Sequence, residues 1–251
     1  MARTVKPEAV AAKRREILNA TQRLVLTKGY EQMSIQDILD EVRISSGAFH
    51  HYFASRGALL EAFIEHIKQE SEKPLLPIIH NPNLSAIEKL QGFFDTLDRL
   101  RIARKADVVK LVRVWYTDDN AIIRQKVDEA LLQQRAPLLT EIVHQGIREG
   151  SFTTAYPDQA GEVILSLLQS MGNTHARLLL SLEQEGDNER CIEQIVAAHA
   201  AYIDAIERML GASPHSFYRA DAGAVNIWVA AMRGMGSANQ AQDKTEEERK
   251  V

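Results

Sequence analysis

The sequence predicts an all-α fold of about nine helices. In almost every long segment, apolar residues recur at the three- and four-residue spacing of an amphipathic helix. No segment alternates apolar and polar residues as a half-buried strand does, and glycine or proline separates several of the helical segments. With 251 residues, 45% of them hydrophobic and 25% charged, the chain can form one or two domains with well-filled cores.

Four helices are expected in the first quarter of the chain, and the middle two are short. Gly29 is suited to end the first helix, because glycine tolerates the left-handed conformation of a helix C-terminus. Ser34 and Ser45 are suited to cap the N-termini of the two short helices. The expected helices cover residues 9–28, 35–42, 45–53 and 55–67.

A proline-rich stretch then interrupts the helical pattern. Pro74, Pro77 and Pro82 exclude a continuous helix and predict a junction. Beyond it we expect a capping box that begins at Ser85, and a bend at Pro137. The expected helices here cover residues 85–116, 120–149, 157–182, 189–210 and, in the tail, 225–232. The expected domains are a head (1–72), a helical body (73–212) and a tail (213–251) that ends in disorder.

Composition and missing motifs exclude several classes of protein. No apolar run is long enough to cross a membrane, and the basic N-terminus lacks the apolar core of a secretory signal, so we expect a cytoplasmic protein. A single cysteine, Cys191, excludes an internal disulfide and a structural zinc module. The sequence has no nucleophile elbow, phosphate loop or His-Glu-x-x-His motif, so we expect no enzyme, no cofactor and no metal site.

The net charge of −4 hides an asymmetry along the chain. Residues 1–56 contain nine Lys/Arg and six Asp/Glu, whereas the remaining residues contain 21 Lys/Arg and 28 Asp/Glu. A basic head favours a polyanionic partner, and an acidic body limits non-specific binding. Chance could produce an excess of this size in a short segment, so the charge alone does not decide the function.

The two short helices and their tight turn have the pattern of a helix-turn-helix, in which the second helix enters the DNA major groove. Phe49 and Phe53 stand four residues apart and predict the buried face of that second helix. Small or polar residues occupy its opposite face: Ser46, Gly47 and His50. Hydroxyl, imidazole and guanidinium donors suited to phosphates surround it: Ser34, Ser45, His51, Tyr52 and Arg56. A plain helical hairpin with a solvated face remains the alternative that periodicity does not exclude.

A longer ordered pattern makes the interpretation more specific. It comprises three stretches, Gly29–Tyr30, Met33–Ile38 and Ile44–Arg56. Together they resemble the DNA-binding head of the TetR family of transcriptional regulators, over about a fifth of the chain. The resemblance implies a homodimeric repressor whose two heads read a pseudo-palindromic operator. It also implies a helical body that releases the operator when it binds a small effector.

The resemblance also implies roles for individual residues. It implies that four residues face the bases: Gln36, Ser46, Gly47 and His50. It also implies that five residues face the phosphates: Ser34, Ser45, His51, Tyr52 and Arg56. The sequence departs from the family at Arg43, where a glycine usually ends the helix, and at His50, where tyrosine is common. The first departure predicts strain or another cap in the turn, and the second leaves the base preference at that position open. A basic arm could add phosphate contacts: Arg3, Lys6, Lys13, Arg14 and Arg15.

The body is expected to hold an effector pocket and a dimer face. The pocket candidates are aromatic, histidine and flexible apolar residues: Phe93, Phe94, Trp115, Tyr116, His144, Met171, Asn173 and His175. The scarcity of paired basic residues favours a hydrophobic or amphipathic effector. The dimer candidates lie on the last two long helices: Val163, Leu167, Ile195, His199, Ile203 and Ile206. A helical protein-interaction module that never binds DNA is the alternative function, and salt dependence of binding separates the two.

Overall fold

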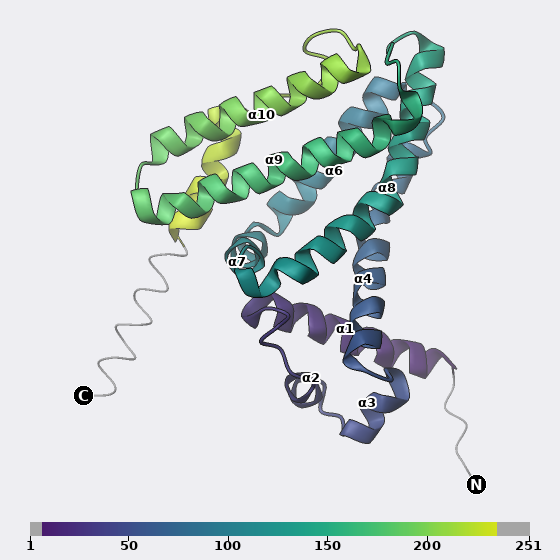
Figure 1. The fold of residues 1–251 in the computed structure, drawn as a ribbon, viewed down its shortest axis with the longest axis vertical. Helices are drawn as coiled ribbons and strands as arrows, with labels where there is room; N and C mark the ends of the chain where they lie inside the picture. The colour runs from purple at the N-terminus through teal and green to yellow at the C-terminus, as the bar shows by residue number, and fades with distance from the viewer. Residues whose placement is uncertain (1–6, 235–251) are drawn as a thin grey trace. The chain divides into compact units, whose positions relative to one another are not determined.

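The protein is all-α in the computed structural model, which describes residues 7–234 (Figure 1). Within that range no residue is in a strand, which confirms the expected fold class. The helices are α1 (Pro7–Lys28), α2 (Ile35–Val42), α3 (Ser46–Tyr52), α4 (Arg56–Glu72), α5 (Leu76–Ile79), α6 (Ala86–Ala103), α7 (Lys105–Trp115), the 3-10 helix η1 (Asp118–Asn120), α8 (Ala121–Glu149), α9 (Pro157–Glu185) and α10 (Asn188–Leu210). Residues 222–234 are also helical. The expected disorder at the C-terminus and the basic residues Arg3 and Lys6 lie outside the described residues.

One expectation about an individual element was wrong. The single helix expected over 85–116 is divided into α6 and α7 at Arg104, whose φ of −116° and ψ of 30° leave the helical region. The proline-rich stretch contains one short helix, α5, which has a proline in its first turn. Neither glycine nor proline marks Arg104, so the helical period runs through it unbroken.

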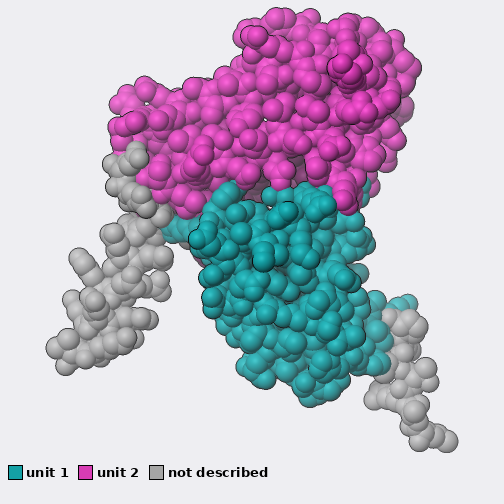
Figure 2. Space-filling model, in the orientation of Figure 1, with its two compact units in different colours: residues 1–73, 113–131 teal, residues 74–112, 132–251 magenta. Residues whose placement is uncertain are grey.

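The chain folds into two compact units (Figure 2). Unit 1 comprises the residues up to 73 together with 113–131, and unit 2 comprises 74–112 and the residues from 132 onward. The first boundary falls beside Pro74, within the predicted junction. Residues 113–131, which we expected to belong to the body, cluster with the head because Ile123 and Val127 are buried in its core.

Unit 1 is held together by an apolar core beneath α3. Phe49 and Phe53 are buried, with their ring centroids 5.7 Å apart, among residues from α1, α2 and α4. Burying two phenylalanine side chains contributes roughly 2–3 kcal/mol each. This anchoring fixes one face of the short helix and leaves the other face exposed.

The caps of α2 follow the expectation from sequence. The Oγ of Ser34 accepts the amide hydrogen of Asp37, while the Asp37 carboxylate accepts the Ser34 amide hydrogen. A hydrogen bond from Lys28, followed by those from Ser34, lowers the pKa of Asp37 to about 2. At the other end, Arg43 has φ 55° and ψ 52°, the left-handed conformation that the family gives to glycine. This conformation costs a residue with a Cβ about 1 kcal/mol.

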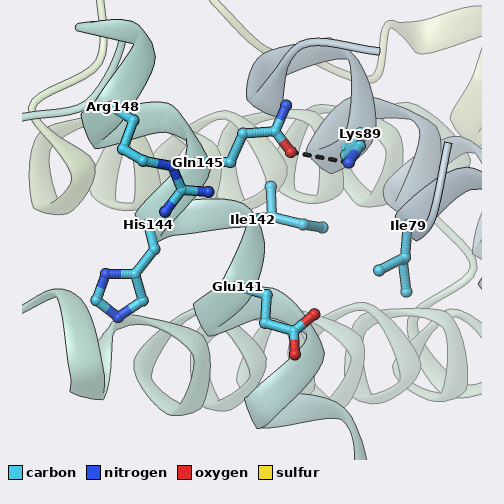
Figure 3. A pocket seen from close by; sticks show the side chains of 7 residues that line it. All are labelled: Ile79, Lys89, Glu141, Ile142, His144, Gln145 and Arg148. Atoms are coloured by element: carbon cyan, nitrogen blue, oxygen red, sulfur yellow. Dashed lines mark hydrogen bonds between the residues drawn. The ribbon is translucent and has the colours of Figure 1, made fainter. Parts of the chain in front are cut away.

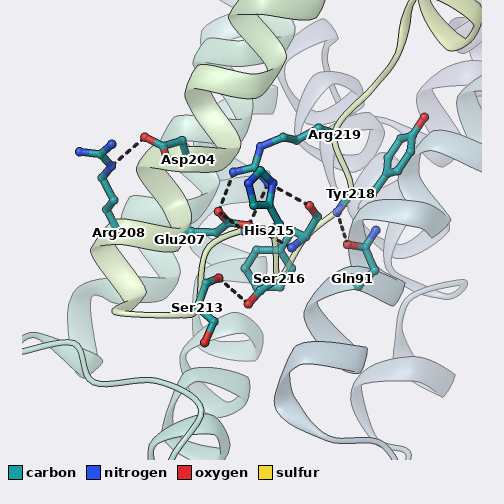
Figure 4. Close-up of polar contacts among 10 residues, drawn as sticks. Gln91, Asp204, Glu207, Arg208, Ser213, His215, Ser216, Tyr218 and Arg219 are labelled. Atoms are coloured by element: carbon teal, nitrogen blue, oxygen red, sulfur yellow. Dashed lines mark hydrogen bonds and ion pairs between the residues drawn. The ribbon is translucent and has the colours of Figure 1, made fainter.

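In unit 2, α9 and α10 lie side by side as the most extensively packed pair of helices (Figure 1). Beyond α10 the chain turns back, and the buried carboxylate of Glu207 binds residues 215–219 by hydrogen bonds (Figure 4). Glu207, only 2% exposed, accepts two hydrogen bonds from the Arg219 guanidinium, at 2.7 and 3.2 Å, and others from the amides of His215 and Phe217. Burial alone would raise the pKa of Glu207, but these hydrogen bonds outweigh it and hold the pKa below its ordinary value.

Replacing Arg219 by methionine tests this attachment. The Arg219→Met change leaves a buried carboxylate with backbone donors alone, so we expect the free energy of unfolding to fall by about 2 kcal/mol. Urea denaturation followed by circular dichroism measures the change. The exposed Arg208, which pairs with Asp204 at 2.7 Å, is the control, and Arg208→Met should cost less than about 0.5 kcal/mol. Equal effects for the two variants would contradict a special role for Glu207.

Candidate nucleic-acid interface and ligand pockets

The outer face of α3 is exposed and carries only small or polar side chains. Ser46, Gly47 and His50 are all exposed, and a Cβ added at Gly47 would meet no atom within 4 Å. Ser45 caps the helix by accepting the Ala48 amide hydrogen at 3.2 Å. Small side chains over the first turn let another molecule approach the helix backbone closely. The structure thus brings three of the four predicted base-facing residues onto one accessible surface.

The fourth predicted base-facing residue and most of the phosphate donors surround this surface. Gln36 is exposed on α2, where its amide donates a hydrogen bond of 2.7 Å to Asp40. Ser34 donates its hydroxyl to Asp37 at 2.8 Å and is exposed, as is Ser45. His51 is exposed beside the half-buried Tyr52, with ring centroids 5.3 Å apart.

Arg56 differs from the other predicted donors. Its Nη2 donates to the Tyr30 carbonyl at 2.6 Å, and its guanidinium lies over the Tyr30 ring, 4.7 Å from the centroid. Its Nε is buried without a hydrogen-bond partner. The guanidinium therefore binds the turn after α1 through Nη2 and the Tyr30 ring, while the residue as a whole stays partly exposed.

Arg14, which sequence reasoning placed in a loose basic arm, has a structural role. Its Nη1 donates to the Tyr52 carbonyl at 2.8 Å, and its guanidinium lies 4.4 Å from the centre of the Phe53 ring. It thus supplies a donor to the C-terminal end of α3 and fastens α1 there. Lys13 forms an ion pair with Glu16 at 2.9 Å, and Arg15 is exposed.

A buried asparagine joins residues 113–131 to the rest of unit 1. Asn120, 1% exposed, accepts the Tyr30 amide hydrogen through Oδ1 at 2.8 Å. Its Nδ2 donates to the Val114 carbonyl at 2.8 Å and to the Thr117 hydroxyl at 3.1 Å. Gly29, with φ 84°, faces it so closely that an added Cβ would lie 2.6 Å from Nδ2. The sequence pattern identified Asn120 only as the start of a helix, so the sequence did not predict this long-range contact.

The Asn120 contact has a measurable energy. Asn120→Ala leaves the buried Tyr30 amide without its partner, whereas the Val114 carbonyl keeps the hydrogen bonds from Thr117. We therefore expect a loss of about 1–3 kcal/mol in the free energy of unfolding. Chemical denaturation measures it, with the exposed Asn226 changed to alanine as the control. A change of less than about 0.5 kcal/mol would show that this contact does not hold the segment.

Some of the predicted pocket residues meet in unit 2. Phe94 and Met171 line a small cavity between α6, α9 and α10, together with Leu168 and Tyr218. His199, which we expected at the dimer face, also lines it. Phe93 is fully buried in the adjacent core, and its ring meets Phe94 edge-on at 6.1 Å. The cavity walls combine apolar and aromatic side chains with nearly as many polar and charged ones, among them Asp95, Asp98 and Arg101.

The other pocket candidates lie elsewhere. Trp115 and Tyr116 belong to unit 1, where Trp115 packs against the core beneath α3 and Arg124 lies over the Tyr116 ring. His144 lines a different cavity and bonds Asp158 at 2.9 Å. Asn173 is exposed on α9. The structure therefore does not bring the eight predicted pocket residues together.

His175 stacks on His199 beside the first cavity. The ring centroids are 5.7 Å apart at an interplanar angle of 13°, and the Nε2 of His175 is buried without a hydrogen-bond partner. Burial lowers the pKa of His175 to about 4, and the charges of His199 and Arg101 act in the same direction. Burial also lowers the pKa of His199. Both rings are therefore neutral near pH 7.

The histidine pair predicts a loss of stability in acid. The unfolded His175 takes up a proton below about pH 6.5, whereas the folded one stays neutral until about pH 4. Its contribution is therefore complete above pH 6.5 and is lost as the pH falls toward 4, by roughly 2 kcal/mol. His175→Phe keeps a ring without the titrating group and should flatten this part of the pH profile in urea denaturation. His80→Gln, at an exposed site, should not, and equal profiles for the wild type and His175→Phe would contradict the assignment.

Most of the predicted dimer residues are already buried within the single chain. Ile203 and Ile206 lie in the core of unit 2 with the half-buried Leu167, while Ile195 is covered by the helical segment 222–234. Val163 alone of the six is exposed, at 40%. The apolar stripe of α10 faces inward because the chain supplies its own cover, which the sequence periodicity could not show.

The chain is similar to known bacterial regulators in both units. Residues 17–63 match the family model described as bacterial regulatory proteins, tetR family. Residues 107–175 match a model described as a tetracyclin repressor-like C-terminal domain. The first match contains α2, α3 and the buried phenylalanines.

Two curated relatives bear regulator names. An uncharacterized HTH-type transcriptional regulator in the lacX 3′ region of Lactococcus lactis subsp. lactis is 36% identical over 80 residues, which is 32% of this chain and 41% of that protein. The uncharacterized HTH-type transcriptional regulator YvdT of Bacillus subtilis (strain 168) is 23% identical over 190 residues, 73% of this chain and 91% of that protein.

Solved structures share the fold. A TetR-family transcriptional regulator from Pectobacterium atrosepticum has a TM-score of 0.54 and 16% identity, covering 82% of this chain and 98% of that one. A TetR transcription regulator from Haloarcula marismortui has a TM-score of 0.53 and 21% identity, covering 78% and 98%. Among the described residues, no helix has both the length and the apolar content needed to span a membrane.

Proposed function

Because the chain belongs to the TetR family of transcriptional regulators, we propose that it is a homodimeric repressor that a small effector releases from a pseudo-palindromic operator. The DNA-binding role rests on one observation. The outer face of α3 is exposed and carries small or polar residues, while Phe49 and Phe53 on its inner face are buried in the core of unit 1. An α-helix with an exposed face of this kind fits the major groove, where base edges present their full pattern of donors and acceptors. Since the proposed target is DNA, we propose that the protein acts in the cytoplasm.

In this proposal, residues on α3 and α2 share the work. Ser46, Gly47 and His50, with Gln36 on α2, face the bases, and His50 can donate to or accept from a base edge. The phosphate contacts come from Ser34, Ser45, His51 and Tyr52. Arg56 and Arg14 act indirectly, by holding the turn after α1 and the C-terminal end of α3 in place.

The proposed dimer uses the outward faces of α9 and α10. Val163 and Ser166 on α9 are exposed, as are Ala197 and Ala201 on α10. Small side chains at these positions allow two helix pairs to approach closely and form a four-helix bundle. These exposed residues take the place of the buried Ile195, Ile203 and Ile206 in the proposed interface, because a partner can contact them.

Effector release follows from the pocket between α6, α9 and α10. Its mixture of apolar and charged side chains favours an amphipathic effector. An effector that binds one conformation of the body more tightly than the other shifts the population toward it. If that conformation holds the two α3 helices at the wrong separation for half-sites one helical turn apart, the operator is released.

DNA binding is tested by selecting bound duplexes from a random pool and measuring the affinity of the enriched sequence. Gly47→Ala should stabilise α3 by up to about 1 kcal/mol yet weaken operator binding about tenfold or more, because the new Cβ occupies the space next to the base edges. Gly172→Ala on α9, where an added Cβ also meets nothing within 4 Å, is the control and should leave binding unchanged.

Substitution of His50 tests the same face from its polar side. His50→Ala should cost about 1–3 kcal/mol of operator affinity and relax base preference at one position per half-site, whereas His80→Ala should change neither. Affinity should also fall steeply as salt rises. If no duplex is enriched, or if binding proves indifferent to salt and to both α3 variants, the proposal fails and an interaction module is favoured.

A further inference from the structure

Unit 2 contains a second cavity that the proposed function does not use. It has a volume of about 500 Å³ and lies between α8 and the α5–α6 region (Figure 3). Two isoleucines, three charged side chains and two polar ones line it: Ile79, Ile142, Lys89, Arg148, Glu141, His144 and Gln145. A cavity of this size is large enough for a small organic molecule.

Lys89 is the unusual member of this lining. It is only 8% exposed, and a buried lysine is normally paired with a carboxylate. Its Nζ donates instead to the neutral amide oxygen of Gln145 at 2.8 Å. Within the described part of the chain, no carboxylate lies within ion-pair distance of this ammonium. Two of its three hydrogens are thus left without a protein acceptor.

Gln145 is held in one orientation by its own hydrogen bonds. Its amide nitrogen donates to the Leu84 carbonyl at 2.9 Å and to Glu149 Oε1 at 2.6 Å. Its oxygen must therefore point at Lys89, as Figure 3 shows. The ammonium is positioned by a rigid partner that does not neutralise it.

Glu149, the carboxylate that accepts a hydrogen bond from Gln145, is already engaged. Glu149 Oε2 accepts the amide hydrogen of Ala86 at 2.9 Å, at the start of α6. That bond, the bond from Gln145 and the charges of Lys89 and Arg148 together lower the pKa of Glu149. Glu149 therefore lowers the positive electrostatic potential around Lys89, but it does not line the cavity. Its two carboxylate oxygens accept hydrogen bonds from the Ala86 amide and from Gln145.

The remaining charges set the character of the cavity. Arg148 is exposed and makes no ion pair among the described residues, whereas His144 bonds Asp158. Glu141 is on the other side of Ile142 from the Lys89–Gln145 bond in the view of Figure 3. This arrangement offers a cationic end, a base formed by two almost fully buried isoleucines, and one opposing negative charge among mostly polar side chains. It suits a small ligand with a single negative charge better than a phosphate dianion.

We propose that this cavity binds a small organic carboxylate. The carboxylate accepts hydrogen bonds from the two unused donors of Lys89, and Arg148 adds a second cation at the mouth. Ile79 and Ile142 contact the apolar part of the ligand. The site does not depend on DNA binding, because all its residues lie within unit 2.

Calorimetric titration of the full-length protein without DNA tests the site, with benzoate and octanoate as probes at constant ionic strength. We expect saturable binding of at least one of them, and at least about tenfold weaker binding of its neutral amide, benzamide or octanamide. Lys89→Met and Arg148→Gln should each weaken binding of the carboxylate by about fivefold or more. Lys110→Met and Arg190→Gln, at exposed sites outside the cavity lining, are the matched controls and should bind as the wild type does.

Each other outcome overturns the proposal. Absence of binding by both carboxylates, or equal binding of carboxylate and amide, would show that the ammonium is not a ligand-binding group. Saturable binding of inorganic phosphate without either carboxylate would identify a different class of ligand. Because Lys89 is buried, circular dichroism must confirm that Lys89→Met is folded, and the exposed Arg148→Gln keeps the test decisive if it is not. Operator binding is measured separately, so failure here leaves the proposed function standing.

Discussion

The burial of Phe49 and Phe53 is the constraint on which the functional surface depends. A seven-residue helix such as α3 is too short to be stable alone in water, so its orientation is decided by tertiary packing. The two rings fill the core of unit 1, and Arg14 secures the chain at the end of the helix. With one face anchored in this way, the small and polar residues of the other face are presented in a fixed arrangement.

A second set of contacts extends that arrangement beyond the N-terminal residues. Asn120 bonds the turn that holds Tyr30, and Arg56 bonds the same residue through its carbonyl. Ile123 and Val127 add apolar packing from the first part of α8. Since α8 continues into unit 2, one continuous helix belongs to both units.

Local patterns predicted much of the fold. Helical periodicity and caps at Ser34 and Ser45 placed α1 to α4 within a few residues, because each cap and each period depends on neighbours in sequence. The outward residues of α3 followed from the same periodicity once the two phenylalanines identified its inner face. At Arg43 the resemblance left strain and another cap open, and the structure has the left-handed conformation.

Features that depend on distant partners were not predictable from one sequence. The Asn120 contact spans 90 residues, and the carboxylate of Glu207 finds Arg219 only after the chain reverses. The apolar stripe of α10 looked suited to a dimer, yet the segment 222–234 and the core of unit 2 cover it. Periodicity reveals that a helix face is apolar, but it does not reveal which part of the molecule covers that face.

The central claim is that the outer face of α3 lies in the major groove. Methylation of guanine N7 by dimethyl sulfate reports on that groove directly, because N7 is exposed there. On the selected operator, the wild type should protect guanines in two clusters about one helical turn, or a multiple of it, apart. Binding that leaves every guanine N7 reactive would contradict the claim.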